Sequence, residues 1–291
     1  MKKNYFKKIT ALVLAMALVL SFTACGSGSD DSTAQEGSSS GAKKIVFAYR
    51  NTGNWPGTGD TADGTPSGYD IELLRLIDEK LEDYEFEFVG TSYDDAYIGL
   101  EAGNYQAALT NAFWTEERAE KYLISEEPQG ASVLTLGLRK ENGDIKNLQE
   151  LSDAGLKLAP LLAGNGMYYV VKQYNEENPD HQVEITTTDD STWVAGSVEE
   201  LVAGKYDAVI YVKATWDSTV VAEDGDNHVF LDQVAYHEFT LANTYPMFAK
   251  SVGEDFLAEY TAALKELKDD GTASQLSQEF FGYDIWNYEF Q

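Results

Sequence analysis

LEAGNYQAALTNAFWTEERAEKYLISEEP, residues 100–128, is the stretch from which the fold is read. Four elements follow one another in it: the end of a helix closed by Gly103, a strand 105–110, a loop carrying Asn111, Phe113 and Trp114, and a second helix opened by Thr115. A strand that leads through a loop into a helix gathers unpaired backbone N–H groups and the positive end of a helix dipole. The pattern therefore predicts an anion-binding site at the carboxyl end of this strand.

Arg118 falls in the first turn of the second helix, where the dipole disfavours a cation. Two interpretations are open. The guanidinium can bind a ligand carboxylate as a bidentate fork, or it can form ion pairs with Glu116, Glu117 or Glu120 on a solvated helix face. From spacing alone, the ion pairs are favoured.

The first 24 residues have the layout of a secretory signal peptide. Four lysines precede the apolar run 9–22, which is too short to form a stable membrane anchor. Cys25 follows Thr23 and Ala24 and is the only cysteine of the 291 residues, so we expect cleavage before it and lipid attachment to it. Plain secretion is the alternative. Residues 25–43 then form the lipidated cysteine and a Gly/Ser-rich flexible tether.

The composition is that of a globular chain, with 43% hydrophobic and 12% aromatic residues. A chain of this length can bury one large core or two smaller ones. Without residues 1–24, 17 basic residues remain against 49 acidic ones, a formal charge of −32. This charge makes nucleic acids and anionic membrane surfaces poor partners, and it makes any buried arginine conspicuous.

Strands and helices alternate along the chain and predict an α/β fold with two lobes. We expect the first part of lobe 1 over residues 44–136, lobe 2 over 137–238 and a return to lobe 1 over 239–291. The elements expected in lobe 1 are strands 44–49, 84–90, 105–110 and 241–250, a long loop 50–68, and helices 69–82, 94–103 and 253–270 before an aromatic tail, 282–290. Those expected in lobe 2 are strands 131–139, 156–161, 183–187 and 206–212, a polar stretch 140–153, and helices 167–175 and 197–204, the latter opened by a capping box at Ser197.

A short internal repeat supports two lobes of similar architecture. Residues 100–109, LEAGNYQAAL, match residues 201–210, LVAGKYDAVI, in their Leu, Ala, Gly and Tyr positions. In both copies a glycine in the left-handed conformation would close a helix, and a tyrosine would begin a strand.

Catalytic and cofactor-binding motifs do not occur in the sequence. The three histidines, His181, His228 and His237, are scattered, and no HExxH, CxxC, GxSxG or GxxxxGK[ST] spacing is found. We therefore expect no metal and no cofactor. A binding cleft remains, because ligands of α/β sheets lie outside the carboxyl ends of the strands and two lobes bring two such edges together. The candidate ligand-binding residues at these edges are Arg50, Trp55, Asn111, Phe113, Trp114, Arg118, Asn165, Gly166 and Tyr211.

Several segments, in order along the chain, resemble the extracellular solute-binding proteins of family 3, the polar-amino-acid receptors of ABC importers. They are SGYDIEL (67–73) for GFDxDL, TEER (115–118) for TPER, SEEP (125–128) for FSxPY, 201–208 for LxxGRxDA, and 268–271 with 281–282 for the closing KxDG and FG. Residues 22–25 resemble a lipobox, with Phe22 where Leu is usual. The sequences GYDIE (68–72) and FWTEER (113–118) are most similar to those of the cystine-type and other polar-amino-acid receptors.

The resemblance implies a periplasmic-binding-protein-like fold with hinge strands between its lobes, in which Arg118 binds the ligand α-carboxylate and Trp55 or Tyr49 stacks on the ligand. Arg50 adds a second possible cation. Other positions depart from the family pattern: Phe113 stands where Ser or Thr is common, and Val212 stands at the position of the Asp that holds the α-amino group. Asp217 and Asp189 are then alternative acids for the amine.

The leading interpretation is a lipid-anchored extracytoplasmic receptor, monomeric, that closes on an amino-acid-like ligand and delivers it to a permease and ATPase. Two alternatives remain. The same fold hosts cleft enzymes of the dehydratase type, for which Asp70 and Glu72 would be a carboxylate pair, although acids also favour the first turn of a helix. A ligand-sensing surface protein without an importer is the third.

Overall fold

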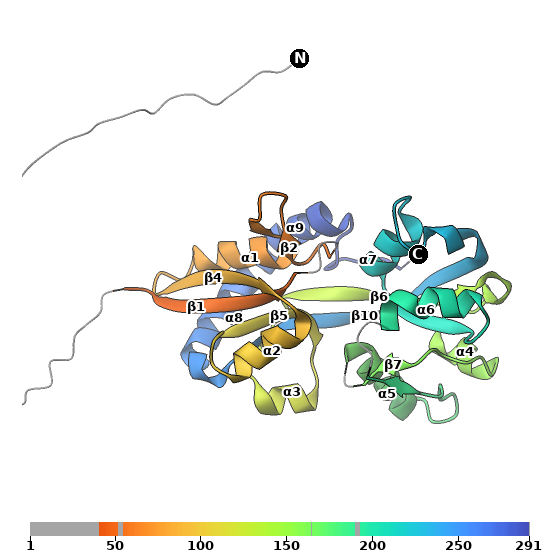
Figure 1. Ribbon diagram of the computed structural model, residues 1–291. Coiled ribbons are helices and arrows are strands. Elements are labelled where there is room, and N and C mark those ends of the chain that lie inside the picture. Colours follow the sequence, from red (N-terminus) through yellow and green to blue (C-terminus); the bar gives the residue numbers. More distant parts are fainter. Residues whose placement is uncertain (1–40, 52–54, 164, 190–192, 291) are drawn as a thin grey trace, which may run out of the picture. The chain divides into compact units, whose positions relative to one another are not determined.

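The computed structural model describes residues 41–290 except 52–54, 164 and 190–192 (Figure 1). The predictions for the signal peptide, for Cys25 and for most of the tether lie outside the described residues. Residues from 41 onward form one compact unit. None of the described helices is long and apolar enough to cross a membrane.

Six of the described strands form one sheet in the order β4-β1-β5-β10-β6-β9. Their bounds are β1 (Lys43–Arg50), β4 (Tyr84–Thr91), β5 (Ala107–Phe113), β6 (Gly130–Arg139), β9 (Ala208–Val212) and β10 (Val234–Phe248). β1 pairs in parallel with β4 and β5. β10 lies antiparallel to both β5 and β6, and β9 lies antiparallel to β6.

The other described elements surround this sheet. Two small sheets are formed by β2 (Gly59–Asp60) with β3 (Pro66–Ser67) and by β7 (Leu161–Leu162) with β8 (Thr187–Thr188). The helices are α1 (Tyr69–Asp78), α2 (Tyr93–Glu101), α3 (Glu116–Lys121), α4 (Leu148–Asp153), α5 (Gly166–Glu177), α6 (Trp193–Val202), α7 (Lys213–Trp216), α8 (Glu254–Asp269) and α9 (Thr272–Phe281). Short helical turns cover Lys140–Asn142, Asp217–Val221, His228–Gln233 and Lys250–Val252.

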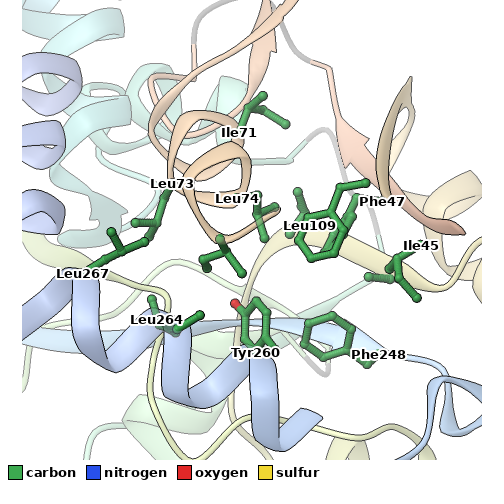
Figure 2. Close-up of a cluster of buried hydrophobic side chains, with 14 of the residues drawn as sticks. Ile45, Phe47, Ile71, Leu73, Leu74, Leu109, Phe248, Tyr260, Leu264 and Leu267 are labelled. Atoms are coloured by element: carbon green, nitrogen blue, oxygen red, sulfur yellow. The ribbon is translucent and has the colours of Figure 1, made fainter. Parts of the chain in front are cut away.

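Lobe 1 is built around apolar side chains of β1, β5, β10, α1 and α8 (Figure 2). Phe248, at the end of β10, is fully buried there. Its ring lies 6.0 Å from that of Phe47, 5.5 Å from that of Phe256 and 4.9 Å from that of Tyr260, all in edge-to-face contact. Such aromatic pairs stabilise a core beyond their buried area.

Lobe 2 has two apolar clusters, on the two faces of its part of the sheet. One holds Leu136, Leu151 and Val171. The other surrounds Trp216, which is fully buried and lies edge-on to Tyr211 at 5.5 Å. β6 and β10 run through both lobes (Figure 1), and these two strands are the connections that the resemblance implies as hinges.

Both copies of the internal repeat end their helix at a left-handed glycine as predicted, but the strands begin at Ala107 and Ala208, two residues after the tyrosines that were expected to begin them. Gly103 (φ 78°) and Gly204 (φ 77°) have left-handed backbones. The following residues, Asn104 and Lys205, donate their backbone N–H groups to Gly99 and Glu200, which closes α2 and α6 in the same way. Helix α2 then leads into β5, and α6 leads into β9.

Several predicted boundaries are wrong. Residues 156–161 and 183–187 were expected to be full strands. In the described structure Leu158 forms an isolated parallel bridge with Ala208, and Leu161–Leu162 pair with Thr187–Thr188. Helix α6 begins before Ser197, so Ser197 is not its cap; its buried hydroxyl instead lies 2.8 Å from that of Tyr211. Helices α4 and α9 were not predicted, and β10 begins at Val234 rather than at 241.

Candidate functional site

The strand β5 extends to Phe113, so Asn111 and Phe113 lie in the strand and not in a loop as predicted. Asn111 has a left-handed backbone, with φ 55°, which Asn tolerates better than most residues. Its side-chain amide donates to the hydroxyl of Ser132 on β6 at 3.0 Å. Asn111 therefore links the end of β5 to the start of a hinge strand.

Arg118 lies in the first turn of α3, as predicted. Thr115 caps this helix and accepts a hydrogen bond from the backbone N–H of Arg118 at 3.2 Å. The guanidinium donates to the carbonyl of Phe113 at 2.6 Å and to the hydroxyl of Tyr93 at 3.4 Å. Both partners are neutral, and no described Asp or Glu lies within ion-pairing distance of Arg118. Glu117 pairs instead with Lys121, at 3.1 Å.

Arg50 ends β1, at the same edge of the sheet. Desolvation by neighbouring atoms lowers the pKa of its guanidinium, and interaction with Tyr93 opposes this lowering. Arg50 also makes no ion pair with the described acids. Tyr93 thus interacts with two guanidiniums, and we refer to Arg50, Tyr93 and Arg118 as the two-arginine site.

Across from this site, Phe113 rests on lobe 2. A Cβ atom placed on Gly166 would lie 1.9 Å from the Phe113 ring, so only glycine fits beneath that ring. Phe113 is 7% exposed and belongs to an apolar cluster with Leu134, Val212, Ala214 and Ala242. Trp55, Met167, Val170, Phe239 and Phe281 pack against this cluster. We call the whole set the interlobe apolar cluster, because it joins residues of both lobes and both hinge strands.

A cavity of about 630 Å³ begins beside this cluster, between the Phe113–Trp114 segment, α5, the start of α4 and β10. Three of the predicted ligand-binding residues line it: Phe113, Trp114 and Gly166. Trp114 is 55% exposed. At its rim the hydroxyl of Tyr169 in lobe 2 donates to Glu117 in lobe 1 at 3.4 Å.

The remaining predicted residues lie elsewhere. Asn165 caps α5, where its side chain accepts from the backbone N–H of Tyr168 at 2.9 Å. Tyr211 is 1% exposed and lies within lobe 2, with its hydroxyl on Ser197. The structure therefore does not bring all nine predicted residues to one cavity.

The two acids considered for a ligand amine are differently placed. Asp217 forms an ion pair with Lys213 at 3.1 Å, and Lys213 also pairs with the buried carboxylate of Glu238 at 3.3 Å. Asp189 is exposed. Asp217 therefore already has a cationic partner.

Two groups near the site were missed by the sequence analysis. Tyr93 was missed because a tyrosine at the start of a helix carries no signal of its own. The other is a buried network at the start of a hinge strand: Gln129 donates to Asp70 at 2.7 Å and accepts from Tyr260 at 2.6 Å, while its backbone carbonyl accepts from Tyr69 at 2.9 Å. Asp70 was considered only as a helix-start acid or a catalytic acid.

Asp70 should make stability depend on pH. Burial raises the pKa of Asp70 to about 7, and the hydrogen bond from Gln129 only partly opposes this. Because the folded-state pKa is raised, the unfolded chain releases the proton first, and stability falls as pH rises from about 4 to about 7, by at most about 1.4 kcal/mol per pH unit. Asp70→Asn should remove this loss. In urea unfolding, the free energy of unfolding of the variant relative to the wild type should increase from about pH 4 to about pH 7 and stay constant above pH 7. A difference that does not change with pH would contradict the assignment.

Comparisons with family models and with individual proteins point to the same family. The model of the bacterial extracellular solute-binding proteins, family 3, matches residues 47–283. The probable amino-acid-binding protein YxeM of Bacillus subtilis is 25% identical over 285 residues, covering 96% of this chain and 97% of the relative. The L-cystine-binding protein TcyK of the same organism is 26% identical over 282 residues, covering 95% of this chain and 97% of the relative.

Solved structures show the same two-lobe fold. One comes from work on glutathione import in Gram-positive bacteria via GshT and the cystine ABC importer TcyBC of Streptococcus mutans. It is 25% identical and has a TM-score of 0.62, and the match covers 84% of this chain and 97% of the chain in that structure. The ancestral amino acid-binding protein AncCDT-1, a precursor of cyclohexadienyl dehydratase, is 22% identical with a TM-score of 0.56, covering 82% of this chain and 95% of its own, and is similar in fold.

Proposed function

Because the chain belongs to the bacterial extracellular solute-binding proteins of family 3, we propose that it is the receptor of an ABC importer. It captures a polar amino acid or a derivative of one between its lobes and delivers it to a membrane permease that works with an ATPase. Relatives named as amino-acid-binding and L-cystine-binding proteins support this class of ligand. Neighbouring genes for a permease and an ATPase would support import over ligand sensing alone.

The observation that carries the proposal is the two-arginine site. Arg50 and Arg118 lie at the carboxyl edge of the lobe 1 sheet, share Tyr93 and have no described carboxylate partner. Arg50 is exposed and Arg118 is half-buried, so both guanidiniums are open to a ligand. In a chain with 49 acidic residues, two neighbouring arginines without a described ion pair support an anionic ligand. Arginine binds carboxylates in a bidentate geometry, so the pair suits a ligand with two acidic groups, such as cystine.

A screen of ligands by thermal unfolding tests this charge preference. Cystine and acidic amino acids should raise the melting temperature more than lysine, arginine or histidine, because a bound ligand stabilises the folded state in proportion to its occupancy. Phe113 and Val212 offer no acid for a basic side chain. The largest shift with a basic amino acid would show that the charge preference is wrong.

A catalytic role has less support. A carboxylate pair of Asp70 and Glu72 would be needed for elimination, but Glu72 pairs with Arg75 and Asp70 is held by Gln129. The two relatives whose matches cover almost all of this chain are named as amino-acid-binding and L-cystine-binding proteins. We therefore propose a binding function rather than an enzyme.

The amino terminus supplies the proposed anchor. Cleavage before Cys25 and attachment of two lipid chains there would give stable membrane binding outside the cytoplasm, with residues 26–43 as the tether and a monomeric receptor above the surface. Mass spectrometry of protein extracted from membranes should find acylated Cys25 as the first residue. A protein that keeps Met1, or that has an unmodified thiol at Cys25, would disprove the anchor.

A further inference from the structure

The end of the chain, residues 281–290, forms a segment that we call the C-terminal strap. Its middle is fixed to lobe 1. Ile285 is 3% exposed within the lobe 1 core and donates its backbone N–H to the hydroxyl of Ser277 at 2.9 Å. The indole N–H of Trp286 donates to the hydroxyl of Tyr69 at 3.1 Å. The middle of the strap is therefore an anchor on lobe 1.

Two tyrosines of the strap contact lobe 2 instead. Lys213 begins α7, and its ammonium lies 5.8 Å from the centroid of the Tyr283 ring. The buried hydroxyl of Tyr288 lies next to the carboxylate of Glu238, in the part of β10 that belongs to lobe 2. Burial raises the pKa of Tyr288, and the neighbouring carboxylate raises it further. The strap therefore extends from one lobe to charged groups of the other.

The charged groups that meet the strap are largely withdrawn from water. The Lys213 ammonium lies 3.3 Å from Glu238, and the side chains of these two residues are 13% and 3% exposed. The ring of Tyr236 lies on the same ammonium from within lobe 2, at 5.5 Å. A desolvated cation gains from contact with aromatic faces, and a buried carboxylate gains from a hydroxyl donor. Tyr283 and Tyr288 supply these contacts only while the lobes lie together, so they favour the closed arrangement.

A row of aromatic rings connects the strap to the interlobe apolar cluster. The ring centroids of Trp55 and Phe281 are 5.9 Å apart. Those of Phe281 and Tyr283 are 5.8 Å apart, and those of Tyr283 and Tyr288 are 5.2 Å apart. Trp55 and Phe281 both pack against the cluster that contains Phe113. The strap is therefore continuous with the apolar contact between the lobes.

We propose that the C-terminal strap holds the two lobes together in the absence of ligand, as a connection additional to β6 and β10. Its middle stays on lobe 1, while Tyr283 and Tyr288 bind Lys213 and Glu238 of lobe 2. The strap thereby sets the population of the closed form before any ligand arrives, and an already closed receptor exchanges its ligand more slowly. This inference goes beyond the proposed function, because it concerns the ligand-free protein.

Spin-label distance measurements on the ligand-free full chain test the proposal. Labels are attached to Glu279→Cys in α9 and to Glu223→Cys in lobe 2, because both positions are exposed. Cys25→Ser removes the one native thiol. With the strap intact, the labels should report mainly one short separation, that of the closed form.

Two changes weaken the strap and leave its anchor in place. Tyr288→Phe removes the hydroxyl next to Glu238, and ending the chain after Asn287 removes the whole Tyr288 ring while Ile285 remains. Each should add a longer separation and raise the ratio of open to closed protein at least about fivefold, with the larger effect for the truncation. The matched control is Glu289→Gln, at an exposed position of the strap, which should leave the ratio unchanged.

Equal distance distributions for the intact, Tyr288→Phe and truncated chains would overturn the proposal. An intact chain that is already as open as the truncated one would overturn it too, and so would a Glu289→Gln variant that opens as far as Tyr288→Phe. Circular dichroism checks that each variant is folded, and Tyr288→Phe decides if the truncated chain does not fold. Failure of cystine to bind would contradict the proposed ligand class and would leave these distances unchanged.

Discussion

Arg118→Ala is expected to abolish ligand binding while the fold remains intact. Removing one partner of a desolvated charge pair costs on the order of 2–5 kcal/mol, which weakens binding by roughly thirty- to several-thousand-fold. The loss should not extend to the fold, because the guanidinium is bonded to neutral groups, Phe113 and Tyr93, and to no described acid. Calorimetry with the cognate ligand, alongside circular dichroism, measures both effects.

Two further variants make this test specific. Arg118→Lys should also fail, because an ammonium cannot reproduce the bidentate geometry of a guanidinium. Lys121→Ala, one turn further along α3, removes an exposed cation that pairs with Glu117 and should keep its affinity. If either Arg118 variant binds within threefold of the wild type, Arg118 does not hold the ligand.

Phe248→Ala is expected to cause the largest loss of stability, about 3–5 kcal/mol. The ring is fully buried and touches three other aromatic rings at the centre of the lobe 1 core (Figure 2). Its removal loses apolar burial and leaves a cavity that the rigid sheet cannot close. Unfolding in guanidinium chloride measures the change in free energy.

The matched control is Phe290→Ala. Phe290 is 50% exposed, near the end of the chain, and its removal should change stability by less than about 0.5 kcal/mol. A loss below about 1 kcal/mol for Phe248→Ala would show that the core repacks around the missing ring.

Local signals predicted a large part of the fold. Thr115 was predicted to open a helix with Arg118 in its first turn, and the cap bond between them confirms both. Gly103 and Gly204 close helices as the repeat implies. These features depend on neighbours within four or five residues, so they can be read directly from the sequence.

The failures depend on contacts between distant segments. Strand 156–161 was predicted from its apolar run, yet this segment divides its pairing between two partners: Leu158 bridges Ala208 of β9, and Leu161 pairs with Thr187 of β8. Phe113 was assigned to a loop, since nothing near it in sequence shows that β10 pairs with β5 up to this residue. Likewise, Tyr93 and Asp70 are brought near the site only by tertiary packing. The contact of the Phe113 ring with Gly166 joins residues more than fifty positions apart in the sequence.

The position of β10 in the sheet has a consequence for how the chain can be made. The edges of β5 and β6 that face each other stay unpaired during synthesis, because β10, which fills the space between them, comes only after residues 140–233 have been added. At typical elongation rates of about 5–20 residues per second, this delay is about 5–20 s. Open strand edges are templates for pairing with other chains, so we expect the nascent chain to be prone to aggregation during this interval. A truncated messenger that stops before residue 234 should therefore yield aggregates rather than a soluble first lobe.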